Sequence, residues 1–229
     1  MKLVLFDIDG TLLWTDGAGR RSMEGALIDI FGSAGDPAYR YDGKTDRQIA
    51  REQMRAAGID DATITARMDD VLANYLTRLE RELARDEAAT RLCGGVSPLL
   101  DALDAHHGAT LGLLTGNIEA GARRKLQAVG VDFTRFRVNA FGSDHEERPQ
   151  LPAVAQRRAE AHFGAPMPGD RMVIIGDTPA DIHCGRAIGV RAIGVATGRY
   201  SVADLAAHGP VAVFETLEDT DAVLAAILD

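Results

Sequence analysis

Five polar residues, four aspartates and a threonine, lie where apolar segments of the sequence end, and their oxygen atoms could bind a cation or take part in catalysis. Asp7 and Asp9 follow "KLVLF", Thr115 ends "ATLGLLT", and Asp177 follows "RMVIIG", with Asp181 one helical turn later. In an open parallel sheet, the carboxyl ends of the strands lie at one edge, and ligands bind there. We therefore expect these side chains to lie close together.

Carboxylates that gather at one place raise one another's pKa, and a bound cation removes this cost. Mg²⁺ takes oxygen ligands and is usually held by one or two carboxylates together with phosphate oxygens. Helices expected to begin at Asn117 and Thr178 would offer free backbone N–H groups to an anion. The sequence therefore predicts a site for Mg²⁺ and a phosphate group.

Four later segments share the apolar character of the first one, and helical patterns alternate with them. The strand-like segments are 109–117, 137–144, 171–178 and 191–198, and the helical ones are 117–130, 151–164 and 178–189. Runs that are apolar on both faces are typical of parallel strands covered by helices. The alternation predicts an α/β fold with a doubly wound parallel sheet.

Residues from about 19 to 107 break this rhythm, because they contain several helical stretches and no convincing strand. The stretch "TDRQIAREQMRAAG" begins with Thr45 and Gln48 in the relation of a capping box. The stretch "SPLLDALDAHHG" begins with Ser97 as its expected cap. We expect an α-helical cap domain, residues 16–92, inserted between the first two strands of a core domain made of 1–15 and 93–229.

Composition narrows the class of protein. The chain has 229 residues and a net charge of −9, which argues against binding to nucleic acid or to an anionic membrane surface. No apolar run reaches the roughly 18 residues that span a membrane, and no secretory leader is recognisable. Two distant cysteines form no metal or redox pattern. We expect a cytoplasmic protein, either monomer or homodimer, whose partner is a small phosphorylated metabolite.

Three of these segments carry motifs that resemble the haloacid dehalogenase superfamily, whose usual members are Mg²⁺-dependent phosphatases. "DIDGTL", residues 7–12, resembles the first motif, "LLTGN", residues 113–117, the second, and "GDTPAD", residues 176–181, the fourth. Their order and strand context agree over essentially the whole chain. The inserted helical segment resembles the phosphoglycolate phosphatase-like members, which carry a cap.

The resemblance implies roles for the polar residues. Asp7 would attack phosphorus and become an aspartyl phosphate, which splits one difficult step into two. Asp9 would protonate the leaving oxygen and then accept a proton from the water that hydrolyses the intermediate. Asp7 and Asp177 would bind Mg²⁺ by their side chains and Asp9 by its backbone carbonyl. Thr115 would donate a hydrogen bond to a phosphoryl oxygen.

The resemblance also extends to the neighbours of these residues. Gly10 and Thr11 would shape the loop that holds the phosphate through backbone N–H groups, and Gly116 and Asn117 would border the same group. Asp181 would be a metal ligand or the partner of a ligand. Its place three residues after Thr178 also fits a simpler role, the completion of a helix cap.

The third motif departs from the family pattern. The family places a Lys, or less often an Arg, between the second and fourth motifs, and the stretch "FGSDHEERPQLPAV" has no lysine. Arg148, which precedes Pro149, is the candidate, because an Arg can bind phosphate through two hydrogen bonds. Arg157 and Arg158 are alternatives that fall in mid-helix, and Lys125 lies too early, inside the preceding helix.

The expected cap contributes weaker candidates. In capped relatives the loop between cap helices reads the substrate, and "DGKTDRQ", residues 42–48, is the matching stretch. Lys44 and Arg47 would meet a carboxylate or second phosphate of the substrate, or would simply be exposed basic residues at a helix start. The expected activity is phosphomonoester hydrolysis. A phosphomutase on the same core and a catalytically silent regulatory protein are the alternatives.

Overall fold

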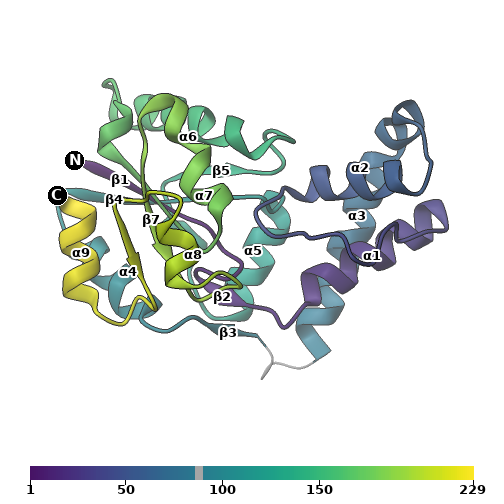
Figure 1. The fold of residues 1–229 in the computed structure, drawn as a ribbon, viewed down its shortest axis with the longest axis horizontal. Helices are drawn as coiled ribbons and strands as arrows, with labels where there is room; N and C mark the ends of the chain where they lie inside the picture. The colour runs from purple at the N-terminus through teal and green to yellow at the C-terminus, as the bar shows by residue number, and fades with distance from the viewer. Residues whose placement is uncertain (86–89) are drawn as a thin grey trace.

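The structure is a computed structural model that describes residues 1–85 and 90–229 of the chain. Six strands form one parallel sheet in the order β5-β4-β1-β6-β7-β8 (Figure 1). Their bounds are β1 Lys2–Phe6, β4 Ala109–Thr115, β5 Val138–Phe141, β6 Met172–Gly176, β7 Arg191–Val195 and β8 Ala212–Phe214. The predicted doubly wound α/β fold is confirmed. The edge strand β8 was not predicted from the sequence.

Helices cover both faces of this sheet. One face packs against α4 (Val96–Ala105), α5 (Glu119–Ala128) and α9 (Thr220–Leu228), and the other against α6 (Leu151–Phe163) and α7 (Pro179–Cys184). Val4 and Phe6 of β1 belong to the first apolar cluster, and Leu3 and Leu5 belong to the second. Successive side chains of a strand point to opposite faces, so this alternation explains why the strand is apolar throughout.

The smaller elements connect these layers. Helix α8 (Val202–Ala206) packs near β7 and β8. The short 3₁₀ helices are η1 (Phe133–Arg135), η2 (Arg148–Gln150), η3 (Gly169–Arg171) and η4 (Arg186–Ile188). None of the helices that the structure describes is long and apolar enough to cross a membrane.

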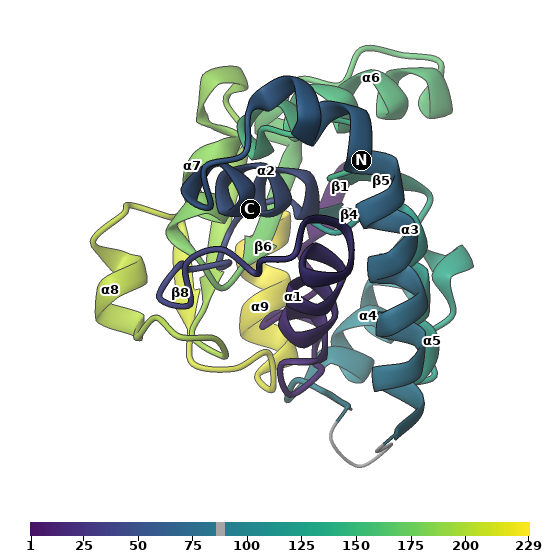
Figure 2. The same cartoon turned by 90° about the vertical axis from the view of Figure 1, so that its right-hand side faces the viewer.

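Three helices between β1 and β4 form a separate unit, which we call the cap helices. They are α1 (Ala18–Phe31), α2 (Asp46–Ala56) and α3 (Asp61–Arg85), and they lie to one side of the sheet (Figures 1 and 2). They bury their own apolar cluster, which includes Met23, Leu27, Met54, Met68 and Tyr75. The proposed domain boundaries at residues 15/16 and 92/93 stay a prediction.

The chain leaves the sheet and returns to it through two short strands. β2 (Leu13–Trp14) and β3 (Arg91–Leu92) pair antiparallel, so the two connections to the cap helices lie side by side. No strand was expected between residues 19 and 107, and that expectation was wrong, because β3 lies there. Two residues are too few to show a periodicity in the sequence, and only the pairing with β2 defines the strand.

Two expected helix starts also need correction. Helix α4 begins at Val96 after Gly95, so Ser97 lies inside it and is not its cap. Helix α5 begins at Glu119 after Ile118, so Asn117 is not the cap either. Thr45 does cap α2 by accepting a hydrogen bond from the N–H of Gln48. The side chain of Gln48 donates to Glu52 at 2.8 Å, so the second half of that capping box is absent.

Candidate active site

A cavity of about 190 Å³ lies between the carboxyl edge of the sheet and the cap helices. Its lining contains the predicted residues Asp7, Asp9, Gly116, Asn117, Thr115, Arg148 and Asp177, and it also includes Lys44. Strands β1, β4 and β6 are neighbours in the sheet, so their ends bring the first, second and fourth motifs to one place. Among the cap helices, α1, α2 and α3 contribute Arg20, Asp46 and Tyr75.

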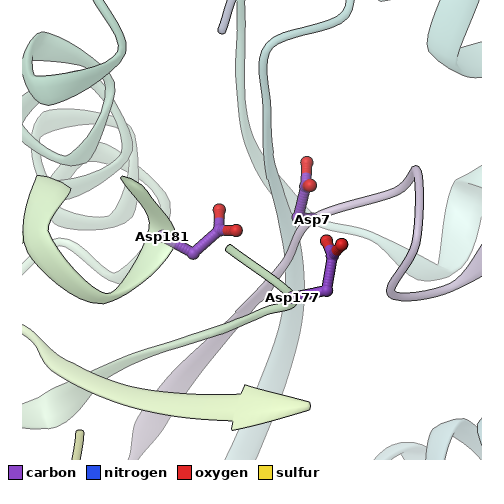
Figure 3. Close-up of side chains that lie close together, drawn as sticks. All are labelled: Asp7, Asp177 and Asp181. Carbon is purple, nitrogen blue, oxygen red and sulfur yellow. The ribbon is translucent and has the colours of Figure 1, made fainter. Parts of the chain in front are cut away.

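Three buried carboxylates cluster at this edge of the sheet, and two of them, Asp7 and Asp177, line the cavity. Asp7, Asp177 and Asp181 each place an oxygen within 4.8 Å of the others. Figure 3 shows Asp7 and Asp177 side by side, with Asp181 pointing toward them from α7. Asp7 directly follows β1, Asp177 directly follows β6, and Asp181 stands in the first turn of α7. Of the four carboxylates expected here, the side chains of Asp7, Asp177 and Asp181 form this group, whereas that of Asp9 bonds to Lys125.

Asp181 also completes a helix cap. Its Oδ2 accepts hydrogen bonds from the backbone N–H of Thr178 at 3.0 Å and from the Thr178 hydroxyl at 2.6 Å, while the Thr178 side chain accepts from the N–H of Asp181. Its Oδ1 faces the guanidinium of Arg148. Both roles suggested for Asp181 are thus compatible, because each oxygen serves a different partner.

Arg148 is the buried cation of the carboxylate cluster. It is the first residue of η2, its Nη2 lies 3.2 Å from Asp7 Oδ1, and the same nitrogen donates to Asp181. Arg158 instead pairs with Asp144 at 2.7 Å and is exposed, as is Arg157. Of the arginines considered from the sequence, Arg148 alone reaches the cluster within the described part of the chain.

Burial sets the electrostatics of these groups. It raises the pKa of Asp7 to about 6, against the opposing effect of Arg148, and Asp181 and Asp9 raise it further. Burial raises the pKa of Asp177 well above its usual value, with added repulsion from Asp181 and Asp7. For Arg148, burial lowers the pKa, but Asp181 and Asp7 outweigh it and the net shift is upward. One guanidinium therefore does not balance three buried carboxylates.

The loop after β1 leaves room for this cluster. Gly10 has φ of +83°, and a Cβ there would lie 2.4 Å from Asp177 Oδ2. The hydroxyl of Thr11 donates to Asp177 Oδ1 at 3.2 Å. The backbone N–H groups of Gly10 and Thr11 donate to the carbonyls of Leu13 and Ile8 inside the turn. These two bonds fix the turn, and the role of Gly10 and Thr11 in shaping a phosphate-binding loop stays a prediction.

Asp9 faces a different set of partners. Lys125 Nζ lies 2.8 Å from Asp9 Oδ1 and 2.6 Å from Oδ2, and the side-chain nitrogen of Asn117 lies 2.7 Å from Oδ2. Asn117 also donates to the Thr115 hydroxyl at 2.8 Å. Lys125, which was set aside as the third-motif cation because it lies too early in the sequence, thus reaches the site through Asp9 and not through Asp7.

The signal that could have found Lys125 is its side-chain direction. Long side chains on a helix point back toward its N-terminus. The N-terminus of α5 lies directly after the second motif. A lysine on the buried face of this helix therefore reaches back toward the strand end.

The cap residues singled out from the sequence lie less directly at the site. The ammonium of Lys44 is held by Glu52 at 2.7 Å and by the Tyr39 hydroxyl at 2.6 Å. Arg47 is absent from the lining of this cavity, as far as the described residues define it. Lys44 therefore lies in the wall of the cavity, where it could contact a substrate, whereas Arg47 lies outside the cavity.

The loop before α2 instead docks on the core. The N–H of Asp46 donates to the carbonyl of Gly116 at 2.8 Å, and Asp46 Oδ2 accepts from the N–H of Ile118 at 2.8 Å. A Cβ at Gly116 would lie 2.0 Å from the carbonyl oxygen of Lys44. A side chain at position 116 would therefore collide with the loop before α2, which packs against the second motif at this point.

The three clustered carboxylates Asp7, Asp177 and Asp181 fit a divalent cation. They are oxygen donors, they are close together, and their charge exceeds that of the one guanidinium beside them. Mg²⁺ prefers such ligands and retains waters and phosphate oxygens as the others. Burial and mutual repulsion raise the pKa values of Asp7 and Asp177, and a cation bound between them would offset this cost.

Comparison with known proteins identifies the family. The model of the haloacid dehalogenase-like hydrolases matches residues 4–186, so the chain belongs to that family and is a hydrolase. The chain is 28% identical over 227 residues to a probable phosphatase, IndB, of Dickeya dadantii, covering 99% of this chain and 94% of that protein. It is also 28% identical over 226 residues to a phosphoglycolate phosphatase of Rhodospirillum rubrum, covering 93% and 87%.

A solved structure shows the same fold. A hydrolase from Pseudomonas syringae superimposes with a TM-score of 0.73 at 20% sequence identity, and the match covers 99% of both chains. The likeness therefore includes the cap helices as well as the sheet.

Proposed function

We propose that this hydrolase is a Mg²⁺-dependent phosphatase that acts on a small phosphomonoester through an aspartyl phosphate on Asp7. The observation that carries the proposal is the buried group of Asp7, Asp177 and Asp181 with Arg148 beside it, of which Asp7, Asp177 and Arg148 line a cavity. The two phosphatase relatives support the reaction class. A cavity of about 190 Å³ favours a small substrate, such as a phosphorylated acid or sugar.

The first step transfers the phosphoryl group to the enzyme. An oxygen of Asp7 attacks phosphorus, and the bond from phosphorus to the leaving oxygen breaks with its electron pair on that oxygen. Asp9 gives the leaving oxygen a proton, so an alcohol departs. Arg148 lies 3.2 Å from the Asp7 carboxylate and can attract the phosphoryl oxygens as they approach. The hydroxyl of Thr115 donates to one of them.

The second step frees the enzyme. Asp9, now a carboxylate, takes a proton from a water whose oxygen attacks the aspartyl phosphate, and the bond to Asp7 breaks with its electrons returning to Asp7. Bound Mg²⁺ would be held by Asp7 and Asp177, by the Asp9 carbonyl and beside Asp181, and supplies positive charge toward the phosphoryl oxygens.

The direct test is release of inorganic phosphate from p-nitrophenyl phosphate, with Mg²⁺ or with EDTA. We expect turnover that depends on Mg²⁺ and disappears in Asp7→Asn, while the exposed Asp170→Asn retains it. A folded protein that shows no turnover with Mg²⁺, or that keeps turnover after Asp7→Asn, would contradict the proposal. A panel of phosphorylated metabolites then identifies the substrate. Formation of an isomer in place of free phosphate would indicate a phosphomutase.

A further inference from the structure

Lys125 is a second buried cation at the cavity, and the mechanism above does not use it. Its side chain is only 4% exposed, and its nitrogen lies 2.8 Å and 2.6 Å from the two oxygens of Asp9 and 2.6 Å from Asn117 Oδ1. An ammonium has three N–H donors, and these three acceptors match them. Within the described residues, Lys125 pairs with Asp9, and Arg148 pairs with Asp7 and Asp181. The two cations thus serve different carboxylates.

The surroundings of Lys125 direct it to this one place. Lys125 stands on the buried face of α5, beside Ala122 and Leu126. On the cap side, a Cβ at Gly19 of α1 would lie 3.4 Å from the Lys125 nitrogen, so the two segments approach closely. Burying an ammonium is costly unless it is paired and hydrogen-bonded. Its side chain therefore has little freedom to leave Asp9.

Asn117 completes the support of Asp9. Its amide nitrogen donates to Asp9 Oδ2 at 2.7 Å and to the Thr115 hydroxyl at 2.8 Å, while its oxygen accepts from Lys125. Both N–H groups of the amide are used. The Asp9 side chain remains 39% exposed, and Asp9 lines the cavity. Its carboxylate is thus held by three hydrogen bonds while part of its surface stays open.

We propose that Lys125, together with Asn117, is a positioning residue that fixes the carboxyl group of Asp9 for proton transfer. This inference rests on the proposed function, in which Asp9 gives a proton to the leaving oxygen and takes one from water. A proton-transfer group must lie within hydrogen-bond reach of the reacting atom, and small displacements are costly. In this role Lys125 acts through Asp9, because its three donors bind Asp9 and Asn117.

The test compares two leaving groups, because only one of them needs an acid. p-Nitrophenolate leaves as a stable anion, whereas an alkoxide must be protonated as it departs. Rapid quench gives the rate of phosphoryl transfer to Asp7 from p-nitrophenyl phosphate and from an alkyl phosphate. The variants are Lys125→Met and Lys125→Arg, with Arg123→Met as a control on the exposed face of the same helix. Circular dichroism confirms that each variant is folded.

We expect Lys125→Met to slow transfer from the alkyl phosphate by about 10- to 100-fold. Transfer from p-nitrophenyl phosphate should change by less than about threefold, with KM similarly unaffected. Lys125→Arg should recover part of the loss, and Arg123→Met should behave as the unchanged protein. Equal losses for both substrates would overturn the proposal, and so would a raised KM at constant kcat, which would make Lys125 a substrate ligand.

Asp9→Asn separates this proposal from the proposed function. If the unchanged protein forms no phosphoryl enzyme from either substrate, the proposed function fails. If Asp9→Asn selectively slows transfer from the alkyl phosphate and Lys125→Met does not, the role of Lys125 alone fails. If both variants selectively slow that transfer, the positioning role is supported.

Discussion

Replacement of Arg148 by methionine would remove the guanidinium that stands between two buried carboxylates. Its Nη2 lies 3.2 Å from Asp7 Oδ1, and the same group contacts Asp181. At an effective dielectric constant of about 20, a pair of charges at this distance attracts by about 5 kcal/mol. Desolvation offsets part of that gain, but removal of one partner leaves the other charges buried without a counter-ion, at a cost of about 3–5 kcal/mol.

The expected result follows from these magnitudes. For a chain of this length, about 3–5 kcal/mol corresponds to a fall in Tm of roughly 6–20 °C in the metal-free protein. Turnover should fall by about 10²- to 10³-fold, as for loss of one group that stabilises transition-state charge. Thermal melts in EDTA and kcat for p-nitrophenyl phosphate with saturating Mg²⁺ measure the two effects.

Arg158→Met is the matched control, because Arg158 is exposed and pairs with Asp144 on the surface. It should change stability by less than about 1 kcal/mol and leave kcat unaltered. The reasoning is refuted if Arg148→Met retains more than about a third of kcat, or if Arg158→Met lowers it as much.

Three further predictions concern the metal, the cap and the loop after β1. Mg²⁺ at about 100 times its Kd should raise Tm by roughly 5–11 °C, and Asp177→Asn should abolish the shift in melts with and without EDTA. Burial raises the pKa of Asp46 from 3.8 to about 6, so the folded state holds its proton more tightly and stability falls as pH rises from about 4 to about 6. Asp46→Asn should reduce this slope in urea titrations, to which Asp7 also contributes, and gain up to about 3 kcal/mol above pH 6; an unchanged slope would contradict the assignment. Gly10→Ala should destroy activity because its Cβ would meet Asp177, whereas Gly58→Ala, with the same φ of +83° and nothing within 4 Å, should cost only about 1–2 kcal/mol of backbone strain and keep kcat.

The sequence was informative where side chains follow strand ends directly. Asp7, Thr115 and Asp177 each stand at or just after a strand end, and the order of parallel strands brings such positions together. Arg148 was found because it lies between the second and fourth motifs and directly precedes Pro149 ahead of the expected helix. The predicted metal ligation and catalytic roles of these residues remain predictions that the experiments above address.

The sequence was less informative where tertiary contacts decide. Lys125 reaches Asp9 only because α5 packs with its buried face toward the cavity, which periodicity alone does not orient. The amides of Gly10 and Thr11 bond within their own turn, and a motif does not reveal where an N–H points. The contact of Asp46 with Ile118 joins residues 72 positions apart. The cytoplasmic location and the oligomeric state stay predictions.

The most direct test of the account is to trap the phosphoryl enzyme. After rapid acid quench of a reaction with substrate and Mg²⁺, mass spectrometry of the digested protein locates the phosphoryl group. We predict one hydroxylamine-sensitive phosphoryl group on Asp7, which is absent from Asp7→Asn. It should accumulate further in Asp9→Asn when the substrate carries a good leaving group. Turnover without a phosphoryl group on Asp7, or with the group on another residue, would contradict the account.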